Sequence, residues 1–391
     1  MNKEIVCFAD DVTGALDVAG SFYSRGYETA VQIEQDINNI PKTPCLVVNL
    51  NSRYDNLKKS AQKISEVVGD ITLKAKLPIF LKVDSTLRGN ILSDSKVLEQ
   101  LDEDKPVFIA PAFPFYGRIC VNGIYLVKGQ PIGETEFAED KAFNYKSSFL
   151  KNNVQDIEHI DWRVLDRGVN AIIEKVTTSK RGRFTFDTRD QTDLELIADA
   201  GLSIGASMIG SSGLARAFPK LSISQPLFNV DNSMPTLFVV GSIHQVSLRQ
   251  KEELAKSGIT GIELSHQDVG NTHVLEDLRD VTREHLEKDG TVFIASPNEI
   301  TNDEILWKEI EDSVAQVSNI QDIKHNLVVV GGETAKATLR GRNIKTLLIR
   351  SEYESGVPMS TEPKKTKAIL TKAGGFGHPN TLVDISHFMR R

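Results

Sequence analysis

The chain has 391 residues, of which 40% are hydrophobic and 25% charged, and its formal net charge is −7. This length exceeds what one hydrophobic core normally serves, so we expect two domains. The acidic balance gives no electrostatic reason to bind nucleic acid or an anionic membrane, and no apolar run approaches the roughly 20 residues of a membrane-spanning helix. Three scattered cysteines argue against a disulfide framework or a zinc site and favour a cytoplasmic setting.

Strands and helices alternate in the first half of the chain. The predicted strands lie at 5–9, 28–33, 45–50, 78–83 and 106–112. The predicted helices between them lie at 13–26, 55–69 and 90–101. This alternation predicts a mostly parallel sheet with helices on both faces. It is interrupted at 123–132, where two alternating runs flank VKGQ and predict a hairpin, and strands resume at 183–187 and 206–210.

The alternation starts again after residues 221–234, which have no clean period and contain several turn formers. We therefore expect one domain at 1–225 and another at 235–391. The second domain has a predicted helix near 246–257, and its predicted strands are TLFVVGS, GTVFIAS, LVVVGGE, KTLLIR and KAILTK. The expected fold class is α/β, with two domains that each form a mostly parallel β-sheet flanked by helices.

Polar and charged side chains follow four successive predicted strands of the first domain. They are Asp10 and Asp11, then Arg53, then Lys82, Asp84, Ser85 and Arg88, and finally Arg118. A single Asp-Asp pair is most often a helix N-cap and a lone arginine is usually a surface charge, but charge at four strand ends indicates a site. Guanidinium forks suit a carboxylate, hydroxyls suit a polyol, and a spare aspartate suits deprotonation of an alcohol. A small hydroxy acid is the ligand that fits this pattern.

The second domain has glycine-rich turns at three strand ends: GSIHQ (241–245), GGET (331–334) and AGGFGHP (373–379). Glycines let backbone N–H groups approach phosphate oxygens, and a following helix N-terminus favours negative charge. Each turn alone is more often just a tight turn, so nucleotide binding and a purely structural role both stay open. The sequence lacks GxxxxGK[ST] and a GxGxxG after its first strand, which argues against a P-loop and a dinucleotide-binding unit.

In chain order, several stretches resemble the signatures of the four-carbon acid sugar kinases. They are ADDVTGALDVA, KVDSTLRGN, APAFPFYGRICVNGIYLV, ETEFAED, GSSGLARAF, GGET and AGGFG. The likeness is collinear over nearly the whole chain. It implies ATP-dependent phosphorylation of a small sugar acid such as threonate, erythronate or 3-oxo-tetronate. It also implies an N-terminal substrate domain, a C-terminal nucleotide domain and an active site in the cleft between them.

The resemblance implies contacts to both substrates. Those to the acid are Asp11, Arg53, Lys82, Val83, Asp84 and Ser85, with Arg88 nearby and with Asp10 added by its place beside Asp11. Those to ATP are Ser242, Gly331, Gly332, Glu333, Thr334, Gly374 and Gly375. We expect Mg²⁺ on the nucleotide phosphates, with Glu333 as an outer-shell partner and no separate metal site of the protein.

The sequence departs from the family pattern at two places. In NLNSR, Asn49 or Asn51 stands where the family often has an aspartate, which bears on the role of a carboxylate there and on the substrate. GSIHQ lacks the serine and cysteine that often follow the GS pair.

For the mechanism, Asp11 is the expected base on the acceptor hydroxyl, and Asp84 is the alternative because it could instead orient a substrate hydroxyl. Lys82 and Arg88 would hold the acid or the migrating phosphoryl group. Two other classes stay open: a hydroxy-acid dehydrogenase and a non-catalytic sugar-acid sensor. A homodimer is one option for the oligomeric state.

Overall fold

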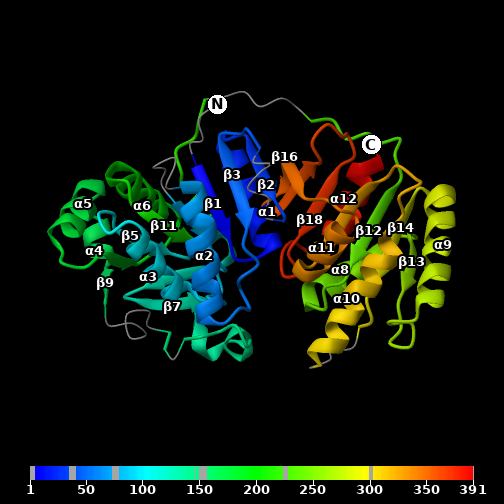
Figure 1. The fold of residues 1–391 in the computed structure, drawn as a ribbon, viewed down its shortest axis with the longest axis horizontal. Helices are drawn as coiled ribbons and strands as arrows, with labels where there is room; N and C mark the ends of the chain where they lie inside the picture. The colour runs from blue at the N-terminus through cyan, green and yellow to red at the C-terminus, as the bar shows by residue number, and fades with distance from the viewer. Residues whose placement is uncertain are drawn as a thin grey trace. The chain divides into compact units, whose positions relative to one another are not determined.

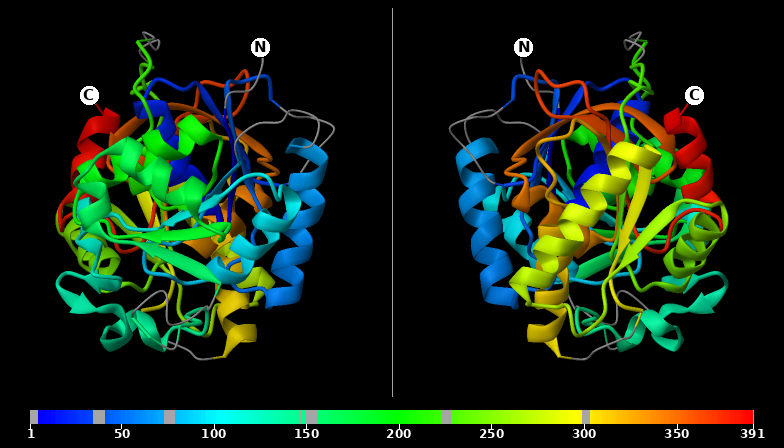
Figure 2. Two further views of the ribbon diagram at one scale, coloured as in Figure 1. Left: turned by 90° about the vertical axis from the view of Figure 1, so that its left-hand side faces the viewer. Right: turned by 90° about the vertical axis from the view of Figure 1, so that its right-hand side faces the viewer.

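The computed structural model describes residues 5–34, 41–72, 79–145, 147–148, 156–222, 228–298 and 303–390. It divides the chain into two compact units, Met1–Ser224 and Gln225–Arg391 (Figure 1). Each unit is a β-sheet with helices on both faces, as the views from the two sides also show (Figure 2). The predicted α/β fold class is thereby confirmed. None of the described helices is long and apolar enough to cross a membrane.

The sheet of the first unit has the order β2-β3-β1-β4-β11-β5-β10-β9 and is parallel throughout. Its strands are β1 (Ile5–Ala9), β2 (Thr29–Gln32), β3 (Cys45–Asn49), β4 (Ile79–Lys82), β5 (Val107–Ala110), β9 (Ile157–Ile160), β10 (Arg183–Phe186) and β11 (Ser207–Gly210). The helices are α1 (Val12–Ser24), α2 (Leu57–Thr72), α3 (Ile91–Leu101), α4 (Trp162–Leu165), α5 (Val169–Thr178), α6 (Gln191–Ile204) and α7 (Ser212–Ala215). Helices α2 and α3 pack together on one face, and α1, α6 and α7 on the other.

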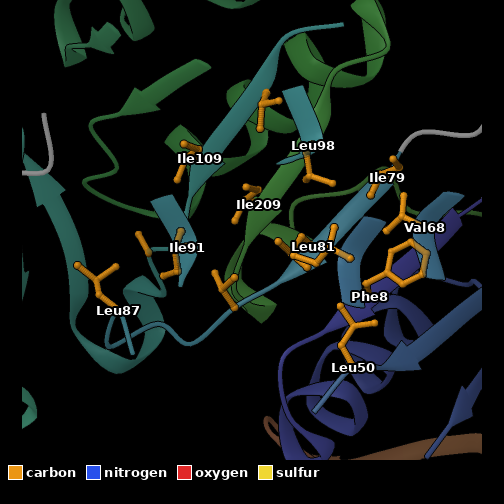
Figure 3. Packing of buried hydrophobic residues seen from close by; sticks show 14 of the residues in the cluster. Phe8, Leu50, Val68, Ile79, Leu81, Leu87, Ile91, Leu98, Ile109 and Ile209 are labelled. Atoms are coloured by element: carbon orange, nitrogen blue, oxygen red, sulfur yellow. The ribbon is translucent and has the colours of Figure 1, made fainter. Parts of the chain in front are cut away.

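Both faces of this sheet are buried, which is why its strands read as continuous apolar runs. Alternate residues of β1 and β4, Phe8 and Leu81 among them, meet α2 and α3 in one core cluster (Figure 3). On the opposite face Phe80 packs edge-on against Phe22 of α1, with ring centroids 5.4 Å apart. The core therefore fixes both sides of β1 and β4 and leaves their carboxyl ends as the positions for polar residues.

A second, antiparallel sheet in the first unit has three strands: β6 (Arg118–Val121), β7 (Ile124–Val127) and β8 (Gln130–Pro131). The predicted hairpin at 123–132 is the β7–β8 pair, and its turn residues Lys128 and Gly129 both have positive φ, as a type I′ turn requires. Asn122 and Gly123 make the same kind of turn one hairpin earlier. Short 3₁₀ helices occupy Pro114–Tyr116, Ile132–Glu134 and Glu136–Glu139.

The sheet of the second unit has the order β13-β14-β12-β15-β18-β17-β16. Its strands are β12 (Thr236–Val240), β13 (Thr260–Glu263), β14 (Thr291–Ala295), β15 (Asn326–Val330), β16 (Thr346–Glu354), β17 (Val357–Thr361) and β18 (Ile369–Lys372). Helices α8 (Gln245–Lys256) and α12 (Thr381–Arg390) pack together, as do α9 (Thr272–Asp289), α10 (Glu304–Ser318) and α11 (Gly332–Gly341). The pairs β16–β17 and β17–β18 are antiparallel and the rest are parallel.

The sequence pattern does not predict β17. Its residues Val357–Thr361 form a buried strand, but they include a proline and two hydroxyl residues and so lack an apolar run. Gly356, with φ +80, makes the turn that folds β17 back on β16.

Candidate active site

Three adjacent parallel strands of the first unit, β3, β1 and β4, end at the same edge of the sheet. In the register of these strands Ala9 lies beside both Asn49 and Lys82. Because parallel strands deliver their carboxyl ends to one edge, the loops that follow them meet there. The structure thus brings together the first three of the charged groups that the sequence pattern singled out.

Arg53 lies at the centre of this cluster and bridges two carboxylates. Its Nε and Nη2 donate to Asp10 at 2.9 and 2.8 Å, and Nη2 also donates to Asp11 Oδ1 at 2.7 Å. The Arg53 side chain is only 10% exposed, against 6% for Asp10 and 13% for Asp11. The bidentate face of this guanidinium is therefore engaged by Asp10, and the N–H groups on Nη1 remain for a further ligand.

Asp11 is both an ion-pair partner and the N-cap of α1. Its Oδ1 accepts from Gly14 N at 2.9 Å and its Oδ2 accepts from Thr13 Oγ1 at 2.7 Å. A Cβ on Gly14 would overlap Asp11 Oδ1 and would lie 2.9 Å from Lys82 Nζ. The glycine therefore makes room for a buried ammonium group at the N-terminus of α1, where the helix dipole is also positive.

A second ion-paired group follows β4. Arg88 Nε donates to Asp84 Oδ2 at 2.6 Å, and Thr86 Oγ1 donates to the same oxygen. Arg88 Nη1 also donates to Asp140 Oδ2 at 3.3 Å, so the 134–140 segment is tied to the strand-end loop. Arg88 is 26% exposed and thus the most accessible cation among these pairs.

The remaining two predicted acid-binding residues are placed differently. Val83 is buried in the core, and its N–H donates to the carbonyl of Gly210 at 2.9 Å. Its side chain therefore cannot face a polar ligand. Ser85 is 7% exposed, and its carbonyl accepts from the hydroxyl of the fully buried Tyr125 at 2.8 Å. The buried Tyr125 hydroxyl thus holds the backbone of the loop that follows β4 at Ser85.

The environments of the three carboxyl groups pull their pKa values apart. Burial raises the pKa of Asp10, although Arg53 opposes the shift. Burial also acts on Asp11, but Arg53 and Lys82 outweigh it and lower the pKa of that carboxyl. Arg88 and Arg53 overcome the burial of Asp84 and hold its pKa far below the usual range. Asp11 and Asp84 are therefore both anionic at neutral pH and can accept a proton or a hydrogen bond.

The two asparagines of NLNSR, Asn49 and Asn51, have structural roles. Asn49 Nδ2 donates to the carbonyl of Ile33 at 3.0 Å, and Asn49 Oδ1 accepts from Asn51 N at 3.1 Å. Asn51 has φ +51, a left-handed conformation that asparagine tolerates better than most residues. Just after this turn, the backbone N–H of Arg53 donates to the carbonyl of Asp10 at 3.1 Å, which holds the loop beside the end of β1.

Three loops of the second unit also meet at one edge, because β12, β15 and β18 are adjacent and parallel. A Cβ on Gly374 would overlap Ser242 Oγ, and a Cβ on Gly331 would lie 3.2 Å from Ser242 Cβ. The predicted residues Ser242, Gly331 and Gly374 therefore lie against one another, and glycine is needed for the approach. Gly331, with φ +113, is also the N-cap of α11.

Helix α11 directs its first N–H groups into this cluster of loops. Gly332 and Glu333 form its first turn, while Thr334 is 2% exposed and packs beside Gly241. A helix start behind a glycine in this conformation is a common anion-binding arrangement. Glu333 is paired with Lys336, with 3.2 Å between Oε2 and Nζ.

The loop Ala373–Gly377 is held by buried side chains. Lys372, at the end of β18, donates from Nζ to the carbonyls of Ala373 at 2.9 Å, Gly374 at 3.4 Å and Phe376 at 3.0 Å. From α8, Ser247 Oγ donates to Gly374 O at 2.7 Å, and Gln250 Nε2 donates to Phe376 O at 3.0 Å. The loop that should contact the nucleotide therefore has a fixed shape.

Sequence reasoning missed three residues of these clusters: Asp140, Lys372 and Ser247. Asp140 lies in ETEFAED, a stretch that resembles a family signature. The sequence thus marked this stretch but did not indicate what Asp140 would contact. Lys372 and Ser247 read as an ordinary lysine and serine, and nothing in their spacing sets them apart. As for metals, no group of three or more His, Cys, Asp or Glu side chains that could hold an ion occurs among the described residues.

Comparisons with known protein families now bear on these two clusters. A family described as a sugar-binding N-terminal domain matches residues 5–218, and one described as a nucleotide-binding C-terminal domain matches residues 237–382.

Curated relatives match over nearly their full length. The chain is 24% identical to a D-threonate kinase of Salmonella typhimurium, with 99% of this chain and 98% of the relative covered. It is 24% identical to a D-erythronate kinase of Heliobacterium modesticaldum, with 97% and 93% covered. It is also 24% identical to a 3-oxo-tetronate kinase of Methylobacterium radiotolerans, with 96% and 97% covered.

The chain belongs to the family of four-carbon acid sugar kinases. The resemblance read from the sequence motifs is thus confirmed. The crystal structure of a Haemophilus influenzae protein shares the fold, with a TM-score of 0.76 at 17% identity. That comparison covers 99% of this chain and 100% of the other.

Proposed function

We propose that this kinase transfers the γ-phosphoryl group of ATP to the terminal hydroxyl of a four-carbon sugar acid of the D-threonate, D-erythronate or 3-oxo-tetronate class. The observation that carries the proposal is the pair of strand-edge clusters, one rich in ion-paired charge and one rich in glycine, within the two family matches. We assign acid binding to residues 1–225 and ATP binding to residues 235–391.

In the acid site, Lys82 and Arg88 are the cations proposed to meet the substrate carboxylate or the migrating phosphoryl group. Lys82 Nζ lies at the N-terminus of α1, and Arg88 is the more exposed of the paired arginines. Arg53 contributes mainly by holding Asp10 and Asp11 in place, since its bidentate face is taken. Asp84 and Ser85 are proposed to bind substrate hydroxyls.

We propose Asp11 as the base on the acceptor hydroxyl, with Asp84 as the alternative. Both carboxylates are anionic at neutral pH. In a loose phosphoryl-transfer transition state the hydroxyl proton leaves late, so alignment of the hydroxyl matters more than basicity. A carboxylate held from three sides, as Asp11 is by Gly14, Thr13 and Arg53, is suited to that alignment.

In the nucleotide site, the N–H groups of Gly331–Thr334 and of Gly374 and Gly375, together with Ser242, are proposed to hold the phosphates. When bound, Mg²⁺ would neutralise charge on the β- and γ-phosphates. Glu333, which is part-exposed and next to this loop, would contact the ion through water. A homodimer remains a prediction, to be tested by light scattering.

The proposal is tested by a coupled ADP-release assay with D- and L-threonate, D- and L-erythronate and the 3-oxo acids. We expect ATP-dependent turnover with one or a few of these acids and none without acid. A rate of ADP release that is the same with and without each of the acids would contradict the proposal. Reduction of a nicotinamide cofactor by the acid would favour the dehydrogenase alternative, and acid binding without ATP binding would favour the sensor.

A further inference from the structure

We infer that Lys372 is a positioning residue: from behind the 373–377 loop it turns the backbone N–H groups of Gly374, Gly375 and Gly377 toward the bound nucleotide. This inference rests on the proposed ATP site and adds a residue that neither the sequence pattern nor the family resemblance assigned. The 373–377 loop has no charged side chain, so its backbone N–H groups are the groups that could bind an anion.

The first step is the direction of the loop carbonyls. Lys372 is 1% exposed, and its Nζ donates to the carbonyls of Ala373, Gly374 and Phe376 at 2.9, 3.4 and 3.0 Å. Three peptide groups of one short loop therefore point their oxygens at a single buried nitrogen.

The second step follows from peptide geometry. In a trans peptide the N–H points away from the carbonyl of the same peptide unit, and the described chain has no cis peptide bonds. The N–H groups opposite the carbonyls of Ala373, Gly374 and Phe376 belong to Gly374, Gly375 and Gly377. These N–H groups therefore point away from Lys372. On the Gly374 side lie Ser242 and His244, the residues that a Cβ on that glycine would approach.

The third step concerns charge. Three carbonyl acceptors call for three N–H donors, which an ammonium group has and a neutral amine lacks. Burial lowers the pKa of Lys372 to about 7, while Glu354 opposes the shift. Charge-assisted bonds to the carbonyls offset the cost of burying the ammonium group, and they polarise the same peptides so that their N–H groups become better donors.

Other anchors limit what the loss of Lys372 would do to the fold. The carbonyl of Gly374 also accepts from Ser247, and that of Phe376 also accepts from Gln250. Gln250 further donates to the carbonyl of His378 at 2.9 Å. Removal of Lys372 should therefore make the orientation of the loop's peptide groups less fixed without unfolding the unit.

The test compares Lys372→Met and Lys372→Gln with the parent enzyme. Methionine fills similar space without donors, and glutamine keeps two N–H donors without charge. We expect Lys372→Met to raise the KM for ATP at least about tenfold, equivalent to 1.4 kcal/mol. Lys372→Gln should fall between parent and Lys372→Met. The KM for the acid and the kcat at saturating ATP should stay within about threefold of the parent, because the loop acts on nucleotide binding alone.

The matched control is Lys367→Met, which removes a lysine paired with Glu362, just before β18 and at the opposite end of the strand from Lys372. It should leave the KM for ATP unchanged. Hydrogen exchange of the 373–377 amides in the nucleotide-free protein supplies a readout that does not depend on activity: exchange should quicken in Lys372→Met and not in Lys367→Met.

The outcomes separate this inference from the proposed function. If calorimetry shows that the parent protein does not bind ATP, the proposed function fails. If the parent binds ATP and a folded Lys372→Met variant binds it equally well, only the inference about Lys372 is overturned. A Lys372→Met variant with a melting temperature far below that of the parent and equal losses for both substrates would also overturn it, since the lysine would then be merely structural.

Discussion

At the scale of single residues, Asp11 combines the role of a helix cap with the position proposed for the catalytic base. Its carboxylate caps α1 through Gly14 N and is also paired with Arg53. The common reading of Asp-Asp at a strand end as an N-cap therefore holds for Asp11. The cap also holds this carboxylate beside Arg53, in the ion-paired cluster at the end of β1. Asp10, by contrast, is not solvated but buried against Arg53.

We expect Asp11→Asn to lower turnover by about 10²–10⁴-fold while changing acid affinity much less, because the amide cannot accept the hydroxyl proton. Asparagine is as good an N-cap as aspartate, but it loses the buried ion pair with Arg53, so the melting temperature should fall and turnover is compared at a temperature at which both proteins are folded. Steady-state kinetics and calorimetry with the acid check this. The control is Asp190→Asn, which changes the N-cap of α6 in the same unit. Turnover of Asp11→Asn within threefold of the parent would exclude Asp11 as the base.

A second residue-scale prediction concerns Asp94, a buried carboxyl in the first turn of α3. Burial raises its pKa from 3.8 to about 7; Ser60, whose hydroxyl donates to it at 2.9 Å, opposes the shift, and Asp10 adds to it. A folded-state pKa above the unfolded value means that this carboxyl contributes stability below about pH 4 and loses it as the pH rises through 7. Asp94→Asn removes the titration and retains an oxygen for Ser60.

The melting temperature of Asp94→Asn, relative to the parent, should therefore rise between pH 4 and pH 8. The difference should reach several degrees, since the shift corresponds to a free energy of unfolding on the order of a few kcal/mol. Thermal denaturation across this pH range measures it. If the parent and variant curves stay parallel, Asp94 is ionised in the folded protein and the prediction is wrong.

At the scale of elements, the 373–377 loop combines two kinds of glycine. Gly377 has φ +82, so a side chain there would be strained. Gly375 does not have positive φ, and a Cβ on it would lie 3.3 Å from Nε2 of the exposed His244. Gly374, whose Cβ would overlap Ser242, is the more tightly packed neighbour. A side chain at Gly375 can thus be accommodated by a rotation of His244, into the space proposed for the nucleotide.

We expect Gly375→Val to weaken ATP binding at least about tenfold, or 1.4 kcal/mol, because the branched side chain blocks the phosphates or ribose. The affinity for the acid should stay near that of the parent, since the residues proposed to bind the acid lie in the other unit. Calorimetry with each ligand makes the comparison. Gly341→Val is the control, because a Cβ there would meet Ala315 Cβ at 3.9 Å, an ordinary contact. Normal ATP binding by a stable Gly375→Val protein would remove this loop from the nucleotide site.

At the scale of the whole molecule, the two compact units separate two kinds of chemistry along the chain. Ion pairs gather at the strand edge of Met1–Ser224, and glycine loops gather at the strand edge of Gln225–Arg391. Ligand-induced stabilisation can therefore be followed for each site separately.

We expect ATP and the acid each to raise the melting temperature when added alone. A ligand at a hundred times its Kd adds about 2.7 kcal/mol to the free energy of unfolding of the unit that binds it. Gly375→Val should lose the response to ATP and keep the response to the acid, and Arg88→Lys should do the reverse. If both variants lose both responses, the assignment of one ligand to each unit is wrong.

The sequence pattern predicts most of the parallel strands, because burial on both faces makes a strand a continuous apolar run, as in β1 and β4. It does not predict the edge strands β9 and β13, which are only partly buried and lack such a run. It also predicts which loops share an edge. It does not predict which charges pair there: Asp10 binds the bidentate face of Arg53, whose backbone N–H also donates to the Asp10 carbonyl. Asp140 reaches Arg88 across 52 positions of sequence. Such pairings depend on loop conformation, which composition and periodicity do not encode.

None of the three cysteines forms a disulfide bond, and all three are buried. Burial raises the pKa of both Cys7 and Cys120 well above the ordinary thiol value. Since the thiolate is the form that reacts, the native thiols should take up alkylating dyes slowly. A cysteine introduced on the surface of each unit would then carry nearly all of the label. The distance between two fluorophores attached in this way would report whether the separation of the two units changes when both substrates are present.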